Sequence, residues 1–198
     1  MIKSICIFCG SSLGSAPIYA SESYKFTKEV VKKGHTIIYG GGNIGIMGVV
    51  AKAAIENNGK IIGVAPKFLK DKEVVRDDLT ELILVEDMFE RKKKLIEISD
   101  GFAVLPGGIG TINEFFEVLT AQQLETIIKP VGILNTDGYY NDLLNMLSHF
   151  VEKKFFRKEH LKNLIVEKDP IKLIKSIENH IPQKIEKWIS ELKKKQYF

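Results

Sequence analysis

Hydrophobic positions follow two different spacings along the chain. Short, almost continuous apolar runs are separated by longer segments in which apolar residues recur every three or four positions. The short runs predict buried β-strands, and the longer segments predict amphipathic helices. The strands are expected at Ser4–Cys9, His35–Tyr39, Lys60–Ala65, Glu81–Val85, Phe102–Leu105, Pro130–Leu134 and Asn163–Val166. The helices are expected at about Pro17–Lys33, Ile46–Asn57, Met88–Ser99, Tyr139–Lys153, Asp169–His180 and Gln183–Lys195, with one more beginning near Thr111 and a short one in the polar loop Phe68–Thr80.

Strands that alternate with helices predict an α/β fold, a Rossmann-like, doubly wound parallel sheet with helices on both faces. The 198 residues are enough for a single nucleotide-binding domain spanning 1–198, in which 183–198 forms a Lys-rich amphipathic helix. Ligands of such sheets bind at the carboxyl ends of the strands. Three turns rich in Gly or Ser are expected there, around Ser11, Gly42 and Gly108, and we expect them to line one crevice.

The turn after Phe102–Leu105 is the strongest chemical signal. It reads Pro106-Gly107-Gly108-Ile109-Gly110-Thr111 and opens a helix. A helix start offers free backbone N–H groups and a positive dipole end to an anion, and glycines let the backbone approach a ligand closely. An alternative interpretation is a capping box, in which Thr111 and Glu114 close off the first N–H groups of the helix. A cap does not need three preceding glycines, so we favour a phosphate cradle.

Other motifs limit the cofactors and metals. The segment Gly40-x-Gly42-x-x-Gly45 matches a dinucleotide fingerprint, but no carboxylate follows at the expected distance, between Ile61 and Lys67. No P-loop motif is present, and the histidines share no ligand spacing, so we expect neither a cofactor nor a metal. Cys6 and Cys9 form a single C-x-x-C pair, which leaves a redox role open but favours small buried residues.

Charge and composition add little to this assignment. From residue 150 onward, 13 Lys and Arg stand against 7 Asp and Glu, which is weak support for nucleic acid and more typical of a solvated helical face, so we expect no nucleic-acid partner. No apolar run resembles a signal peptide or a membrane span, so we expect a cytoplasmic protein with no membrane partner. Within the basic run Glu90–Lys94, Arg91 stands out because the start of its helix lies near a strand's carboxyl end, where a guanidinium can bind phosphate or sugar.

Several of these segments, taken together, resemble the LONELY GUY family of cytokinin riboside 5′-monophosphate phosphoribohydrolases, which are often labelled lysine decarboxylases. The resemblance covers roughly residues 1 to 150 in the right order. It rests on the signature P-G-G-x-G-T-x-x-E at Pro106–Glu114, on Phe8–Ser12, on Tyr39–Gly42 with Gly45–Gly48, on Met88-x-x-Arg91-Lys92, and on Lys129–Gly132.

The resemblance implies hydrolysis of the N-glycosidic bond of a nucleoside 5′-monophosphate, giving free base and ribose 5-phosphate. It implies that the catalytic residues are Arg91 and Glu114, and that the protein is a homodimer or a larger homo-oligomer with the site near the subunit interface. The substrate contacts it implies are Glu73, Lys92, Gly107, Gly108, Ile109, Gly110, Thr111, Asn113 and Thr120, to which the other two turns add Ser11 and Gly42.

Glu114 follows Thr111 by one helical turn, so both are expected to point to the same side. The helix N-terminus is expected to favour its ionised form, which suits stabilisation of an oxocarbenium ion and activation of water. Arg91 would then hold Glu114 and pair with ribose or phosphate oxygens.

Three positions depart from the family pattern and bear on base preference. Asn113 stands where many members have Glu, Phe89 where many have His, and Ala121 where many have Trp. Two other functions stay open at this point. One is a non-catalytic carrier similar to the molybdenum-cofactor carriers, and the other is a pyridoxal-phosphate decarboxylase, for which the chain offers no convincing Schiff-base lysine.

Overall fold

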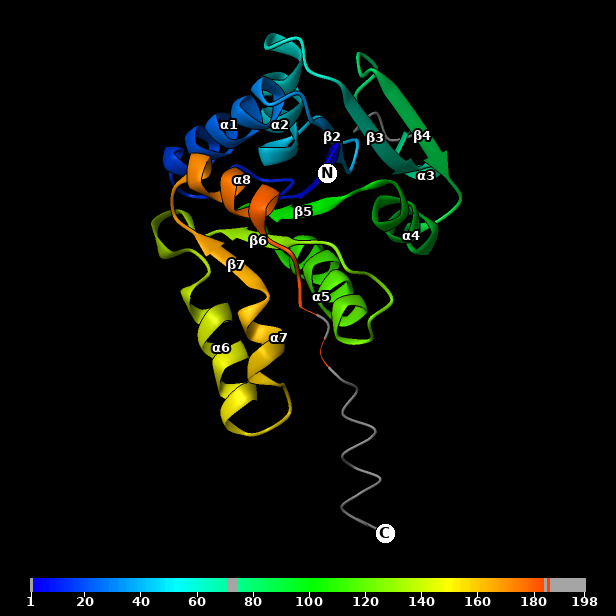
Figure 1. Ribbon diagram of the computed structural model, residues 1–198. Helices are drawn as coiled ribbons and strands as arrows, with labels where there is room; N and C mark the ends of the chain where they lie inside the picture. Colours follow the sequence, from blue (N-terminus) through cyan, green and yellow to red (C-terminus); the bar gives the residue numbers. More distant parts are fainter. Residues whose placement is uncertain (1, 71–74, 184, 186–198) are drawn as a thin grey trace.

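The computed structural model describes residues 2–70, 75–183 and 185 (Figure 1). Its described strands form one parallel sheet in the order β4-β3-β2-β1-β5-β6-β7. The strands are β1 (Ser4–Phe8), β2 (Thr36–Tyr39), β3 (Ile61–Pro66), β4 (Glu81–Val85), β5 (Gly101–Val104), β6 (Val131–Leu134) and β7 (Leu164–Glu167). All of the predicted strands are present, each within two residues of its expected limits.

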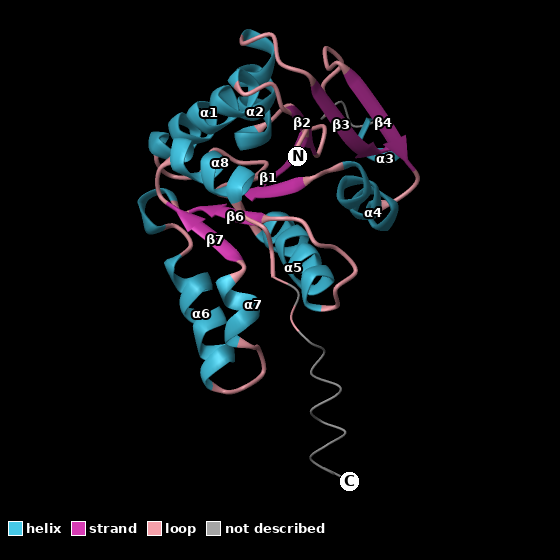
Figure 2. Ribbon diagram, viewed as in Figure 1, coloured by secondary structure: helices cyan, strands magenta, loops and turns pink. Residues whose placement is uncertain are grey.

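Helices cover both faces of the sheet, as predicted (Figure 2). They are α1 (Pro17–Lys32), α2 (Gly45–Glu56), α3 (Lys67–Lys70), α4 (Met88–Ile98), α5 (Ile109–Gln123), α6 (Asn141–Glu152), α7 (Lys158–Lys162) and α8 (Pro170–Asn179). Side chains of α1, α2 and α8 build one hydrophobic core, and those of α4, α5 and α6 build the other. Because successive strand residues point to opposite faces, Ile5 and Ile7 belong to the first core while Cys6 and Phe8 belong to the second.

The two cysteines lie in different cores. Cys6 belongs to the core under α4 and α5, Cys9 belongs to the core under α1 and α2, and both are buried free thiols. This confirms the interpretation as small buried residues and leaves no basis for a redox pair.

Two helices, α5 and α6, begin two residues away from their predicted starts. The helix α6 begins at Asn141 rather than at Tyr139, because a 3-10 turn precedes it and the side chain of Asn135 accepts the backbone N–H of Tyr140. The helix α5 begins at Ile109, so Thr111 is its third residue and is buried, and Gly108 occupies the N-cap. The capping-box alternative is therefore wrong. The helix α7 was not predicted, and the amphipathic helix expected at 183–195 lies outside the described residues apart from Gln183 and Ile185, which are not helical.

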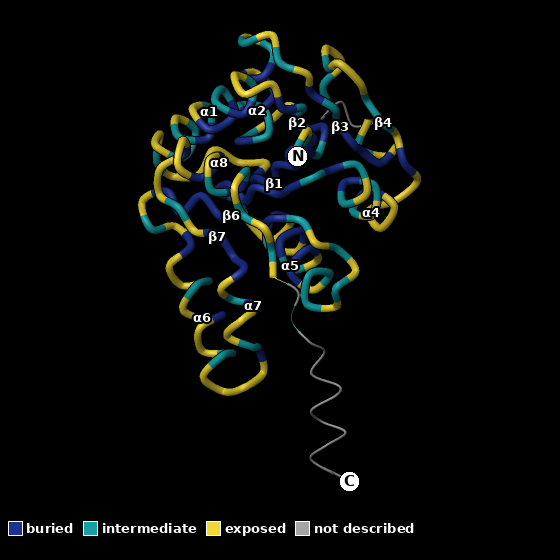
Figure 3. Tube along the Cα trace, in the orientation of Figure 1, coloured by how far each residue is buried: buried dark blue, intermediate teal, exposed yellow. Residues whose placement is uncertain are grey.

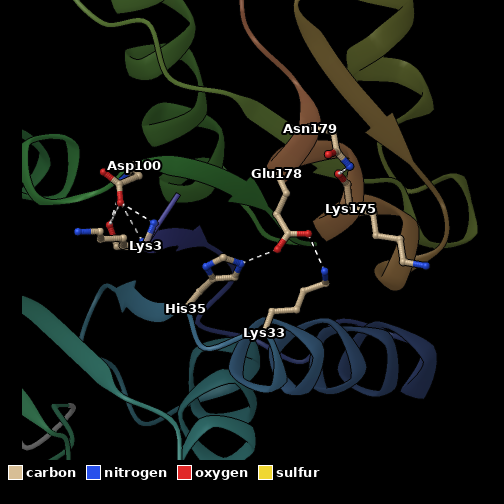
Figure 4. Close-up of polar contacts among 8 residues, drawn as sticks. Lys3, Lys33, His35, Asp100, Lys175, Glu178 and Asn179 are labelled. Atoms are coloured by element: carbon tan, nitrogen blue, oxygen red, sulfur yellow. Dashed lines mark hydrogen bonds and ion pairs between the residues drawn. The ribbon is translucent and has the colours of Figure 1, made fainter. Parts of the chain in front are cut away.

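Polar contacts tie the amino ends of the strands together (Figure 4). Glu178 on α8 accepts hydrogen bonds from Lys33 Nζ at 2.6 Å and pairs with His35 Nε2 at 2.8 Å. On the same edge of the sheet, Asp100 accepts the backbone N–H of Lys3 at 2.8 Å. The first contacts join α8 to the turn before β2, and the last joins the residue before β5 to the segment that leads into β1, both at the end of the sheet opposite the carboxyl ends of the strands.

Burial follows the layers, with the sheet innermost and the outer helix faces exposed (Figure 3). No described helix combines the length and the apolar character needed to cross a bilayer.

Candidate functional site

The strand order reverses its direction at β1, which lies between β2 and β5. At such a switch point, the loops that follow neighbouring strands leave in opposite directions and open a crevice. A cavity of about 430 Å³ occupies this place. The described residues that line it come from all three predicted turns, from α2, α3, α4 and α5, and from the segment before β4; they are Cys9, Gly10, Ser11, Gly40, Gly42, Ile44, Met47, Leu69, Val75, Arg91, Gly108, Ile109, Gly110, Thr111 and Glu114.

Two of the turns are in direct backbone contact. The N–H of Gly10 donates to the carbonyl of Pro106 at 3.1 Å. A Cβ atom on Gly107 would lie 2.7 Å from the nitrogen of Gly10 and 2.2 Å from Oγ1 of Thr111, so only glycine fits there. Gly45 has a φ of +61°, and a Cβ on it would lie 2.2 Å from the carbonyl carbon of Ser11. Of the three glycines in the apparent dinucleotide fingerprint, Gly45 thus serves close backbone packing, whereas a Cβ on Gly40 or Gly42 would meet the side chain of Arg91 or of Met47.

The start of α5 faces the cavity. A Cβ atom on Gly108 or on Gly110 would meet no heavy atom within 4 Å, so both positions border open space. Gly108 is the N-cap and supplies no side-chain cap, which leaves the first N–H groups of the helix without intrahelical acceptors. This geometry supports the predicted anion cradle.

Arg91 and Glu114 form a buried ion pair inside the cavity. The helix α4 begins with Asp87 as its N-cap, whose carboxylate accepts the N–H groups of Phe89 and Glu90 at 2.8 Å. From the first turn of α4, Arg91 donates from Nε to the carbonyl of Val64 at 3.0 Å and from Nη1 to Oε1 of Glu114 at 2.7 Å. The two side chains are only 10% and 11% exposed.

Burial raises the pKa of Glu114 above its ordinary value of 4.5, and the neighbouring Arg91 opposes that rise. The expectation that the helix N-terminus favours the ionised form needs correction. Glu114 is the sixth residue of α5, beyond the first turn in which the helix dipole acts strongly. The ion pair with Arg91 is therefore what supports the carboxylate.

Some predicted contacts lie elsewhere. Lys92 is not among the residues that line the cavity; it donates to Glu117 at 2.8 Å and lies over the ring of Phe89. Asn113 and Thr120 are exposed on another face of α5 and line a separate cavity of about 410 Å³. Gly107 lines a smaller cavity beside the main one. Glu73 lies outside the described residues.

The sequence interpretation missed the apolar wall of the cavity. Ile44, Met47, Leu69 and Val75 line it together with Ile109. Val75 reaches the site through an isolated antiparallel bridge with Gly42. An apolar wall in the same cavity as an anion cradle fits a molecule with one charged end and one apolar end. Ile44 and Met47 lie within the glycine-rich segment that follows β2, but nothing in the local sequence marks Leu69 and Val75, which reach the cavity through tertiary packing.

The part of the chain that is described holds no group of three or more His, Cys, Asp or Glu side chains suited to a metal ion.

The chain is similar in sequence to one protein family and to several of its members. A family profile described as "Possible lysine decarboxylase" matches residues 47–177. A probable cytokinin riboside 5′-monophosphate phosphoribohydrolase of Oryza sativa subsp. japonica is 39% identical over 191 residues, which cover 96% of this chain and 78% of the relative. A cytokinin riboside 5′-monophosphate phosphoribohydrolase of Arabidopsis thaliana is 38% identical over 181 residues, which cover 91% of this chain and 85% of the relative.

Among solved structures, a molybdenum cofactor binding protein and a Moco carrier protein share the fold. The molybdenum cofactor binding protein of Rippkaea orientalis superposes with a TM-score of 0.66 at 23% identity, covering 90% of this chain and 99% of its own. The Moco carrier protein of Chlamydomonas reinhardtii gives a TM-score of 0.68 at 20% identity, covering 90% of this chain and 96% of its own. At this level of identity the likeness concerns the fold alone.

Proposed function

The chain belongs to the family of the cytokinin riboside 5′-monophosphate phosphoribohydrolases, and we propose that it hydrolyses the N-glycosidic bond of adenosine 5′-monophosphates of the cytokinin type. The products are the free base and ribose 5-phosphate. The observation that carries the proposal is the buried Arg91–Glu114 pair, which lies in the same cavity as the glycine turn at the start of α5.

Cleavage of a ribosyl C–N bond builds positive charge on the sugar, as in glycoside hydrolysis. A carboxylate near the anomeric carbon stabilises that charge and accepts a proton from the attacking water. Oε1 of Glu114 is held by Arg91, while Oε2 has no hydrogen-bond partner among the described residues. That second oxygen is free for water or for a ribose hydroxyl, so Glu114 fits both roles.

Arg91 acts mainly by holding Glu114. Two of its three nitrogens are engaged, Nε by the carbonyl of Val64 and Nη1 by Glu114. The remaining nitrogen, Nη2, lies beside Gly40 at the wall of the cavity, where it can contact a substrate oxygen. The phosphate would bind the N–H groups at the start of α5, and the base would pack against the apolar wall.

The test is chromatography of AMP and of isopentenyladenosine monophosphate after incubation with the pure protein. Free base is expected with the wild type and not with Glu114→Gln or Arg91→Ala. Glu152→Gln, on the exposed surface of α6 and outside the cavity, is the matched control and should release base normally. Tight binding of both nucleotides without release of base would overturn the hydrolase and leave a carrier. The nucleotide that is hydrolysed faster identifies the preferred base.

The description as a possible lysine decarboxylase has no support in the cavity. None of the described residues that line it is a lysine, the side chain that forms a Schiff base with pyridoxal phosphate.

Substrate contacts are also proposed for Asn113 and Thr120, although they face away from the cavity of their own chain. We therefore propose a homodimer or larger homo-oligomer, in which this face of α5 approaches the site of a second copy. Light scattering coupled to size-exclusion chromatography tests this, and a monomeric mass with full activity would contradict it. A cytoplasmic location and the lack of nucleic-acid or membrane partners stay predictions from the sequence.

A further inference from the structure

Two tyrosine hydroxyls bind the backbone of the glycine turn. Oη of Tyr140 donates to the carbonyl of Leu105 at 2.7 Å, and Oη of Tyr139 donates to the carbonyl of Gly107 at 2.9 Å. The two rings meet edge to face, with centroids 4.8 Å apart. The hydrogen bonds thus flank Pro106, from a segment more than thirty residues further along the chain.

The two tyrosines differ in their surroundings. Tyr140 is 2% exposed and is part of the core under α5, so its role is explained by packing. Tyr139 is 43% exposed and lines a cavity of about 280 Å³, which shares Gly10, Ser11 and Gly108 with the main cavity. Its only described ring neighbours are Tyr19, with centroids 5.4 Å apart, and Tyr140. Core packing does not account for the hydroxyl of Tyr139.

The bond to Gly107 controls the direction of the next N–H group. A peptide unit is planar, so the carbonyl of Gly107 and the N–H of Gly108 point in opposite directions. Rotation of this unit is easy between two glycines, because neither residue has a side chain to restrict it. When Tyr139 holds the carbonyl, the N–H of Gly108 is fixed on the opposite side. A rotated unit would instead present a carbonyl oxygen where the anion binds.

We propose that Tyr139 is a positioning residue for the substrate phosphate, which it serves by locking the Gly107–Gly108 peptide in the anion-binding orientation. Tyr139 itself does not touch the substrate in this role. The kinetic part of the proposal rests on the proposed hydrolase function, whereas the binding part does not.

The test uses Tyr139→Phe, which keeps the ring and removes only the hydroxyl. A neutral hydrogen bond of this kind is expected to change binding about three- to ten-fold. Calorimetry should show ribose 5-phosphate binding weaker by that factor. For a nucleoside 5′-monophosphate KM should rise by the same factor with kcat nearly unchanged, while kcat/KM for the nucleoside without phosphate should not change.

Tyr24→Phe is the matched control. Its hydroxyl donates to Glu56 at 2.8 Å on the outside of α1 and α2, so its loss should affect neither binding nor turnover. Unchanged binding of ribose 5-phosphate by Tyr139→Phe would overturn the proposal, and so would an equal loss for substrates with and without phosphate. If the wild type releases no base but ribose 5-phosphate binding still depends on Tyr139, the hydrolase fails and the positioning role stands.

Discussion

A Cβ atom on Gly40 would lie 2.0 Å from Nη2 of Arg91. The missing side chain at residue 40 is therefore what lets the guanidinium lie close to the backbone just after β2, where it reaches both Val64 and Glu114. This contact joins the turn after β2 to the first turn of α4, two segments fifty residues apart in the sequence.

Gly40→Ala should strongly lower the activity of the protein without unfolding it. The φ of Gly40 is not positive, so alanine is tolerated by the backbone, and the flexible end of Arg91 can move away. Glu114 then loses its fixed partner. Because small displacements of a catalytic group are costly, we expect kcat/KM to fall by about 100-fold while the melting temperature stays within a few degrees. The double variant Gly40→Ala/Arg91→Ala should be no worse than Arg91→Ala alone, and fully additive losses would contradict this coupling.

The sequence predicted the layers and the crevice because both depend on local patterns. Apolar runs mark the strands, and parallel strands bring their carboxyl ends to one edge. The meeting of Arg91 with Glu114 was predicted from a family resemblance, and the geometry agrees with it. The contact of Gly40 with Arg91 and the bond of Tyr139 to Gly107 were not predicted, because they depend on where distant segments meet.

The spacing of residues along α5 already implies that Asn113 and Thr120 face a different side of the helix from Glu114. Consecutive helical residues are about 100° apart, so Asn113 cannot share the direction of Glu114. Thr120 follows Glu114 by six residues and also falls on another side of α5. Neither residue can therefore reach the cavity of its own chain.

The pH dependence of hydrolysis should report the raised pKa of Glu114. Activity needs the carboxylate, so kcat/KM should fall on the acid side at a pH above 4.5, the ordinary value for glutamate. The charges of Arg91 and Lys92 both lower this pKa, although burial outweighs them.

Lys92→Met keeps the ion pair between Arg91 and Glu114 and should move the acid limb of the pH profile to higher pH. Lys93→Met, on the solvent side of α4, is the control and should leave the limb in place. A wild-type limb at or below 4.5 would contradict the burial argument.

Gly107 and Gly108 should respond differently to the same substitution. A Cβ on Gly107 collides with backbone and with Thr111, so Gly107→Ala should lower the free energy of unfolding by about 1–3 kcal/mol. A Cβ on Gly108 enters open space, so Gly108→Ala should fold normally and weaken the binding of ribose 5-phosphate by crowding the cradle. Chemical denaturation and calorimetry on both variants measure the two effects. Normal phosphate binding by Gly108→Ala would place the anion elsewhere.

The contact of Glu178 with the turn before β2 should make stability fall in acid. Burial acts to raise the pKa of Glu178, but the hydrogen bonds from Lys33 and His35 outweigh it and hold the pKa below 4.5. A carboxyl group whose pKa is lowered by folding contributes stability above its unfolded pKa, and this contribution is lost as the pH falls through the folded value. Glu178→Gln should therefore cost about 0.5–1 kcal/mol at pH 7, and the difference from the wild type should vanish well below pH 4.5. Glu152→Gln, which removes an exposed pair with Lys153, should change stability little at either pH. A Glu178→Gln protein that loses as much stability in acid as the wild type would show that other carboxylates set this dependence.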